Sequence, residues 1–165
     1  MSHIIYQTEG IVLGKRDFGE ADRMYNIYTE KFGMIEVMAQ GIRYLKSKLR
    51  YNLDLFAYGN FSLVAGRDIW RITDAEEIKS NRKIIADERK LNLFSRIANF
   101  LTRMIRGEER NDFIWQEVKK IFLAGGEEIE TMIAILHNLG YMAELPESKK
   151  EKIAAINRAF KESML

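Results

Sequence analysis

The stretch T-E-G-I-V-L-G-K-R-D-F-G-E-A-D-R, residues 8–23, joins an apolar segment to a loop dense in charge. Its apolar run, residues 11–13, has the β-branched content of a buried strand, and Gly14 and Gly19 bracket the turn that follows. Charged side chains of both signs crowd this turn: Lys15, Arg16, Asp17, Glu20, Asp22 and Arg23. Such a turn is typical either of a solvated loop held by its own weak ion pairs or of a binding surface. The stretch therefore predicts a strand and leaves the role of the turn open.

Four further segments have the composition of strands. They lie near residues 23–29, 34–39, 53–65 and 69–75, and each is rich in Ile, Val, Tyr, Phe or Thr between turn residues. Residues 65–68, A-G-R-D, have the short spacing of a hairpin between the last two segments. With the strand at 10–15, this makes five strands in the first half of the chain. A small antiparallel module of this kind favours the Greek-key barrel called the OB-fold, which binds oligonucleotides on one face and its loops.

In the second half of the chain, apolar residues recur every three or four positions, which predicts helices. Apolar positions predict one helix over 91–105, a second capped by Asp112 and stopped at residues 125–126, and a third over 129–139 closed by Gly140. Ser148 and Glu151 fit a capping box for a last helix to about residue 162, a natural end of the chain. We therefore predict an α+β protein with an OB-fold domain at 1–80 and a helical bundle at 81–165.

Composition narrows the class of protein. The chain has 165 residues, 47% hydrophobic and 30% charged, with no 18-residue apolar run and no signal-peptide pattern, so we expect a cytoplasmic protein without membrane association. The absence of cysteine excludes disulfides, thiolate nucleophiles and cysteine-ligated metals. The net charge is only +2, but residues 41–71 hold six Lys or Arg against two Asp. This local excess favours a polyanionic partner.

Catalytic and metal-binding motifs are missing. The two histidines, His3 and His137, have no spaced partners for a metal site, and no nucleophile elbow, P-loop or dinucleotide fingerprint occurs. The acids at 127, 128 and 130 are typical of a helix N-terminus, where the helix dipole favours negative charge. We therefore expect neither an enzyme nor a cofactor.

The segment G-I-R-Y-L-K-S-K-L-R, residues 41–50, has the clearest binding character. It carries four cations around Tyr44 without an acid. Cations along a backbone and a ring for base stacking are the two elements of sequence-tolerant single-strand binding, although a solvated loop with Tyr44 folded inward fits the same residues. Trp70 and Arg71 pose the same alternative, and on an alternating strand the pattern favours a buried Trp70.

The order of these landmarks resembles the RecO family of bacterial recombination mediators. The opening string G-I-V-L-x-x-R-D-F-G-E-A-D-R resembles the start of RecO, and short landmarks continue the likeness in family order: T-E-K-F-G at 29–33, A-Q-G-I-R at 39–43, K-S-K-L-R at 46–50, W-R-I-T-D-A-E at 70–76 and L-H-N-L-G-Y at 136–141. The resemblance implies an OB-fold joined to a helical domain. It also implies binding of single- and double-stranded DNA, annealing of complementary strands, and loading of RecA, with RecR, onto strands covered by single-strand-binding protein (SSB).

The resemblance also implies site residues. The expected DNA contacts are Arg16, Arg23, Arg43, Tyr44, Lys46, Lys48, Arg50 and Arg71. An apolar pocket in the helical domain would bind the acidic SSB tail, and the cations expected to meet the tail are Arg103, Arg106, Lys119 and Lys120. Many family members carry a four-cysteine zinc module after the L-G-Y stretch, but this chain continues through Pro146 to its last helix, so we expect no zinc.

Two other functions remain compatible with the residues. An RNA-binding OB module would share the basic loop and would tolerate the 2′-hydroxyl. A protein-interaction adaptor would act through the helical domain and would keep its activity if the basic loop were neutralised.

Overall fold

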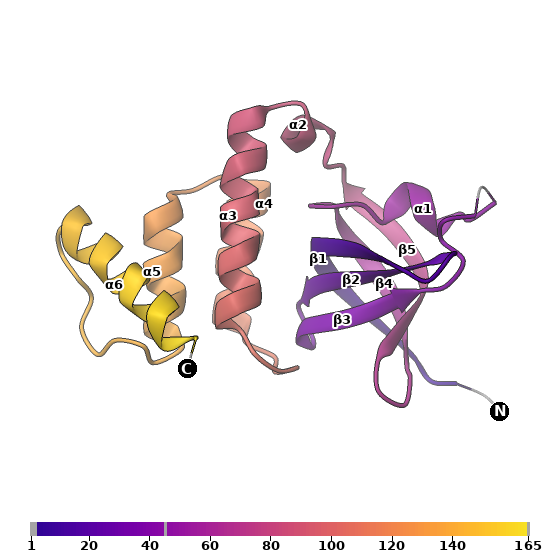
Figure 1. The fold of residues 1–165 in the computed structure, drawn as a ribbon, viewed down its shortest axis with the longest axis horizontal. Coiled ribbons are helices and arrows are strands. Elements are labelled where there is room, and N and C mark those ends of the chain that lie inside the picture. The colour runs from indigo at the N-terminus through magenta and orange to yellow at the C-terminus, as the bar shows by residue number, and fades with distance from the viewer. Residues whose placement is uncertain (1–2, 45, 165) are drawn as a thin grey trace.

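A computed structural model describes residues 3–44 and 46–164 and places a five-stranded barrel beside a group of helices (Figure 1). The strands are β1 (Ile5–Phe18), β2 (Asp22–Thr29), β3 (Gly33–Ala39), β4 (Tyr58–Ala65) and β5 (Trp70–Lys79). They close in the order β1-β2-β3-β5-β4, with β3 and β5 parallel and the other neighbours antiparallel. This is the predicted OB-fold barrel, and the helices that follow it confirm the α+β class.

The helices are α1 (Leu49–Asn52), α2 (Arg82–Ile85), α3 (Glu88–Met104), α4 (Asp112–Leu123), α5 (Glu128–Asn138) and α6 (Lys149–Glu162). The last four follow the predicted pattern, and α6 begins with the predicted capping box of Ser148 and Glu151. The cap of α4 differs from the prediction. Asn111, not Asp112, accepts from the Ile114 amide, at 3.0 Å, and Asp112 is the first helical residue. No helix in the described part of the chain is long and apolar enough to span a membrane.

Strand β1 is much longer than the strand predicted over residues 10–15 because it pairs with two neighbouring strands. Its first half, from Ile5 to Ile11, pairs with β4, and its second half, from Gly10 to Phe18, pairs with β2. The register shifts between Val12 and Gly14, as a β-bulge does where a strand bends. This bend lets one strand close the barrel and carries its charged end to the β1–β2 turn.

Strand β4 begins at Tyr58, so the predicted strand over 53–65 is wrong in its first part. Residues 53–57 form a turn, in which Phe56 has φ 62° and its amide donates to the Val12 carbonyl at 2.8 Å. Leu53 lies in the barrel interior, whereas Phe56 packs between barrel and helices. The apolar content that suggests a strand here reflects burial in two separate cores.

The helices dock on the barrel through a second hydrophobic core. One cluster fills the barrel, and the other joins Ile11, Tyr28 and Tyr58 of the barrel to residues of α3, α4 and α5. The Trp115 ring of α4 lies 6.3 Å from the Tyr28 ring and 6.4 Å from the Tyr58 ring. Figure 1 shows α3 between the barrel and the α5–α6 pair. The barrel and the helices therefore share one buried interface.

Candidate nucleic-acid interface

The basic segment and the β1–β2 turn lie against each other. The Arg43 amide donates to the Ala21 carbonyl at 3.0 Å, and the Arg43 guanidinium donates to the Gly19 carbonyl at 3.1 Å. The Gly41 amide donates to the Asp22 carboxylate at 2.7 Å. We call the surface formed by residues 15–23, 41–44 and 46–52 the loop surface. It brings together seven of the eight predicted DNA contacts: Arg16, Arg23, Arg43, Tyr44, Lys46, Lys48 and Arg50.

Four cations of the loop surface have carboxylate partners, and the first of them, Lys15, lies 2.6 Å from Asp54. Asp17 lies 2.7 Å from Arg23 Nε and 3.8 Å from Arg43 Nε, whereas Arg16 pairs with Glu36 of β3 at 2.7 Å. The hydrogen bond from Arg23 lowers the pKa of Asp17 below its ordinary value of 3.8. These ion pairs shape the turn, and a phosphate would have to compete with them for Arg16, Arg23 and Arg43.

The other predicted DNA contacts of the loop surface have exposed side chains. Lys46, Lys48 and Arg50 are exposed, and none forms an ion pair with another described residue. The Tyr44 side chain is 65% exposed, so it is not folded inward. Tyr51 is 74% exposed and was missed by the sequence reasoning, although it directly follows Arg50 in the same acid-free run. This part of the surface offers uncompensated cations and two accessible rings.

Trp70 is a packing residue. Its half-buried ring lies 5.0 Å from Phe32 and 5.5 Å from Tyr6, and its Nε1 donates to Glu108 at 3.0 Å. The ring packs against the barrel core but is only partly buried, whereas the sequence favours full burial. Arg71, the eighth predicted DNA contact, is half-buried and lies opposite Met38 of β3.

Three of the four cations expected to meet the SSB tail lie at two different contacts. Arg103 donates to the Ser163 hydroxyl and the Phe160 carbonyl, and Arg106 donates to the Ser163 carbonyl, so both hold the end of α6. Lys119 lies 3.7 Å from the Glu9 carboxylate and over the Tyr58 ring, at the junction between barrel and helices. Lys120 is exposed on the same helix.

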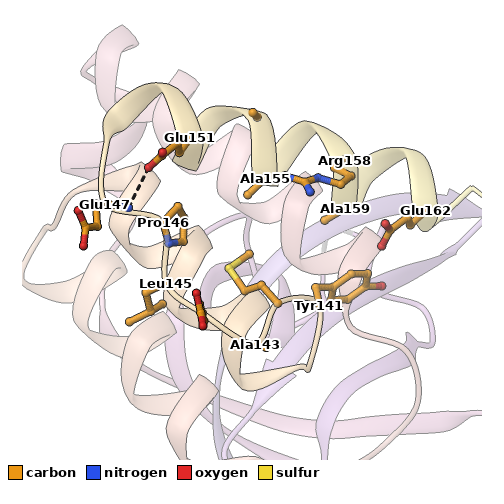
Figure 2. A pocket seen from close by; sticks show the side chains of 13 residues that line it. Tyr141, Ala143, Leu145, Pro146, Glu147, Glu151, Ala155, Arg158, Ala159 and Glu162 are labelled. Atoms are coloured by element: carbon orange, nitrogen blue, oxygen red, sulfur yellow. Dashed lines mark hydrogen bonds between the residues drawn. The ribbon is translucent and has the colours of Figure 1, made fainter.

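A cavity of about 680 Å³ lies between residues 141–147 and α6 (Figure 2). Its apolar lining includes Met142 and the 58% exposed Leu145. Its charged lining consists of one cation and four acids: Arg158, Glu144, Glu147, Glu151 and Glu162. Glu151 already accepts from the Ser148 amide in the capping box. The negative balance disfavours an acidic peptide, and none of the four predicted tail-binding cations lines this cavity.

Metal-ligating side chains do not gather in the part of the chain that the structure describes. There, no group of three or more His, Cys, Asp or Glu is placed to hold a metal ion.

A closed β1-β2-β3-β5-β4 barrel with a basic, tyrosine-bearing segment between β3 and β4 defines an OB-fold protein with an appended helical domain. Residues 1–81 match the family model described as Recombination protein O N terminal. The chain belongs to the RecO family.

Curated relatives extend the match into the helices. The DNA repair protein RecO of Clostridium acetobutylicum is 28% identical over 156 residues, which cover 90% of this chain and 63% of that protein. RecO of Halalkalibacterium halodurans is 26% identical over 113 residues, 68% of this chain and 44% of the relative. RecO of Synechocystis is 44% identical over 71 residues, 43% and 26% of the two chains. The chain spans about half the length of the curated relatives it matches.

Proposed function

We propose that this chain is a non-catalytic recombination mediator that binds single- and double-stranded DNA through the loop surface. It anneals complementary strands and, with RecR, helps load RecA onto SSB-coated DNA in the bacterial cytoplasm. The observation that carries the proposal is the exposure of Tyr44, Lys46, Lys48 and Arg50 on one loop of an OB-fold barrel. Phosphates would meet the cations, and bases would stack on the ring.

Family membership supports the repair role, since the matched relatives are DNA repair proteins. The mechanism requires no proton transfer. Annealing follows if the surface holds a strand mainly by its backbone, because the pairing edges of the bases then stay accessible to a complementary strand. The proposed roles of RecR, SSB and RecA rest on the resemblance to the RecO family alone.

The test is fluorescence anisotropy with labelled single-stranded DNA, duplex DNA and single-stranded RNA across a salt series. Four to six phosphate contacts predict a slope of log affinity against log salt of about −3 to −4 for a single strand. A variant with Arg43, Lys46, Lys48 and Arg50 changed to Gln should lose most of this slope. Its matched control changes Lys149, Lys150, Arg158 and Lys161 to Gln on α6, which lies at the opposite end of the molecule (Figure 1).

Equal losses in the two quadruple variants, or unchanged affinity in the loop variant, would contradict the assigned surface. Tighter binding to RNA than to DNA would favour the RNA-binding alternative. The mediator role needs a separate assay, in which complementary oligonucleotides anneal with and without SSB. Failure to accelerate annealing at saturating protein would refute that role even if DNA binds.

A further inference from the structure

A groove of about 480 Å³ lies where the barrel meets the helices. Arg50 and Tyr51 of α1 line one part of it, and Arg82 and Ile85 of α2 line another. Because Arg50 and Tyr51 also belong to the loop surface, the groove continues that surface toward the helical domain. Its volume is within the range of small-ligand sites in proteins, so it can take a group the size of a nucleotide.

The floor of the groove is held in place. The buried Asn81 side chain donates to the Leu55 carbonyl at 2.7 Å and to Asp54 at 3.3 Å. Lys15 Nζ lies 2.6 Å from Asp54, so the charge of this acid is matched. Glu77 is the other acid in the lining. Asn81 and Asp54 are therefore held in place, and Glu77 is a lining acid without an ion pair among the described residues.

The walls carry the features that bind a nucleic acid. The exposed guanidinium groups of Arg50 and Arg82 come from two different elements, and neither forms an ion pair with any residue in 3–44 or 46–164. The Tyr51 ring is 74% exposed beside them. Two cations at one groove suit a phosphate, and an accessible ring suits a base. Lys83, exposed on α2, extends the positive charge beyond the groove.

We propose that this groove binds one nucleotide of a single DNA strand, with its phosphate between Arg50 and Arg82 and its base on Tyr51. The bound strand then leaves the barrel loop and crosses onto α2, so the helical domain forms part of the DNA path. This inference rests on the proposed function and adds a second binding segment to it. An acidic peptide is the competing occupant, since it would share the arginines but would gain less from the ring.

The test measures single-stranded DNA affinity for Tyr51→Ala, Arg82→Gln and Glu77→Gln. Loss of one stacked base should weaken binding by about five- to a hundredfold in Tyr51→Ala. Loss of one phosphate contact should make the salt slope of Arg82→Gln shallower by about 0.7. Glu77→Gln removes an acid next to the phosphate and should tighten binding. The controls are Tyr141→Ala and Lys150→Gln, which make the same kinds of change in the α5–α6 region, with thermal unfolding to verify folding.

The outcomes separate the two proposals. If wild type binds DNA and the quadruple loop variant does not, but Tyr51→Ala and Arg82→Gln bind like wild type, the groove proposal fails and the proposed function stands. If wild type does not bind DNA, the proposed function fails first. If Tyr141→Ala and Lys150→Gln lose as much DNA affinity as Tyr51→Ala and Arg82→Gln, the groove proposal is also overturned. A fluorescent polyglutamate peptide that binds wild type as tightly as DNA does, and loses affinity in Arg82→Gln, would identify the competing occupant.

Discussion

Arg23 Nε lies 2.7 Å from Oδ1 of Asp17 across the β1–β2 turn, so one of the predicted phosphate contacts already has a carboxylate partner. The same carboxylate lies 3.8 Å from Arg43 Nε. Asp17 therefore compensates two cations of the loop surface at once. A phosphate that binds there has to displace or tolerate this acid.

Asp17→Asn should tighten single-stranded DNA binding. The change removes a negative charge from the surface and leaves Arg23 and Arg43 without their carboxylate partner. Removal of a like charge close to a phosphate should raise affinity by about a few fold at low salt. Anisotropy at low and high salt measures the effect, and the gain should shrink as salt rises. Asp68→Asn, on the exposed β4–β5 loop, is the control with the same charge change. An equal gain in both variants would contradict a local role for Asp17.

Asp54→Asn should lower stability at neutral pH and have no effect in strong acid. Burial alone would raise the pKa of Asp54, but hydrogen bonds from Lys15, the Leu55 amide and Asn81 hold it below 3.8. A lowered pKa in the folded state stabilises the protein above the unfolded pKa, and this stability is lost as pH falls through the folded value. The Asp54 side chain is 42% exposed, so the loss should be about 1 kcal/mol or less.

Urea unfolding at several pH values measures this difference. The free energies of unfolding of wild type and Asp54→Asn should differ by a constant amount between about pH 5 and 8 and converge below the folded pKa. Glu20→Gln, on the exposed β1–β2 turn, is the control that removes one carboxylate elsewhere on the surface. A difference that grows toward acid would contradict the sign of the pKa shift.

The barrel was predictable from local signals. Strand-forming residues between turn residues located all five strands, and apolar periodicity located α3. Terminal signals marked the end of α5 and the start of α6. All these features depend on residues close together in the sequence. The helices α1 and α2 were not anticipated, since four residues carry too little periodicity to be recognised. The turn at 53–57 was missed because burial in two cores produces the same apolar content as a strand.

The basic residues of the candidate site could be predicted from the sequence, but their ion-pair partners could not. The basic loop is readable from four cations without an acid, whereas the ion pair of Arg16 with Glu36 joins residues 20 positions apart and depends on strand register. The groove lined by Tyr51 could not be predicted, because it is formed by residues of both α1 and α2, which are far apart in the sequence. Likewise, the acidic lining of the α6 cavity comes from two segments that the sequence does not show to be facing each other.

Gly33→Ala should destabilise the protein more than Gly19→Ala. Both glycines have positive φ, 65° and 60°, where an added Cβ costs about 1–2 kcal/mol. At Gly33 the Cβ would also lie 2.3 Å from the Glu109 carbonyl oxygen, whereas at Gly19 no atom lies within 4 Å. Gly19→Ala should therefore lose about 1 kcal/mol and Gly33→Ala clearly more, as measured by urea unfolding. Equal losses would show that the 107–111 loop moves aside without cost.

Trp115→Ala should lower the free energy of unfolding by about 3–5 kcal/mol, the usual cost of removing a large buried aromatic side chain. Trp115 is 2% exposed and packs on Tyr28 and Tyr58, so its loss opens the interface between helices and barrel. Urea unfolding followed by circular dichroism and by tryptophan fluorescence, which reports Trp70 and Trp115 together, should give coincident transitions in wild type, because the two halves share this core. Phe113→Ala, on the same helix but 45% exposed, should change stability by about 0.5 kcal/mol or less. In Trp115→Ala, Trp70 is the remaining tryptophan and reports on the barrel. If the variant's circular dichroism transition moves to lower urea while its Trp70 fluorescence still changes at the wild-type midpoint, the barrel is stable without the helices and the shared core does not couple them.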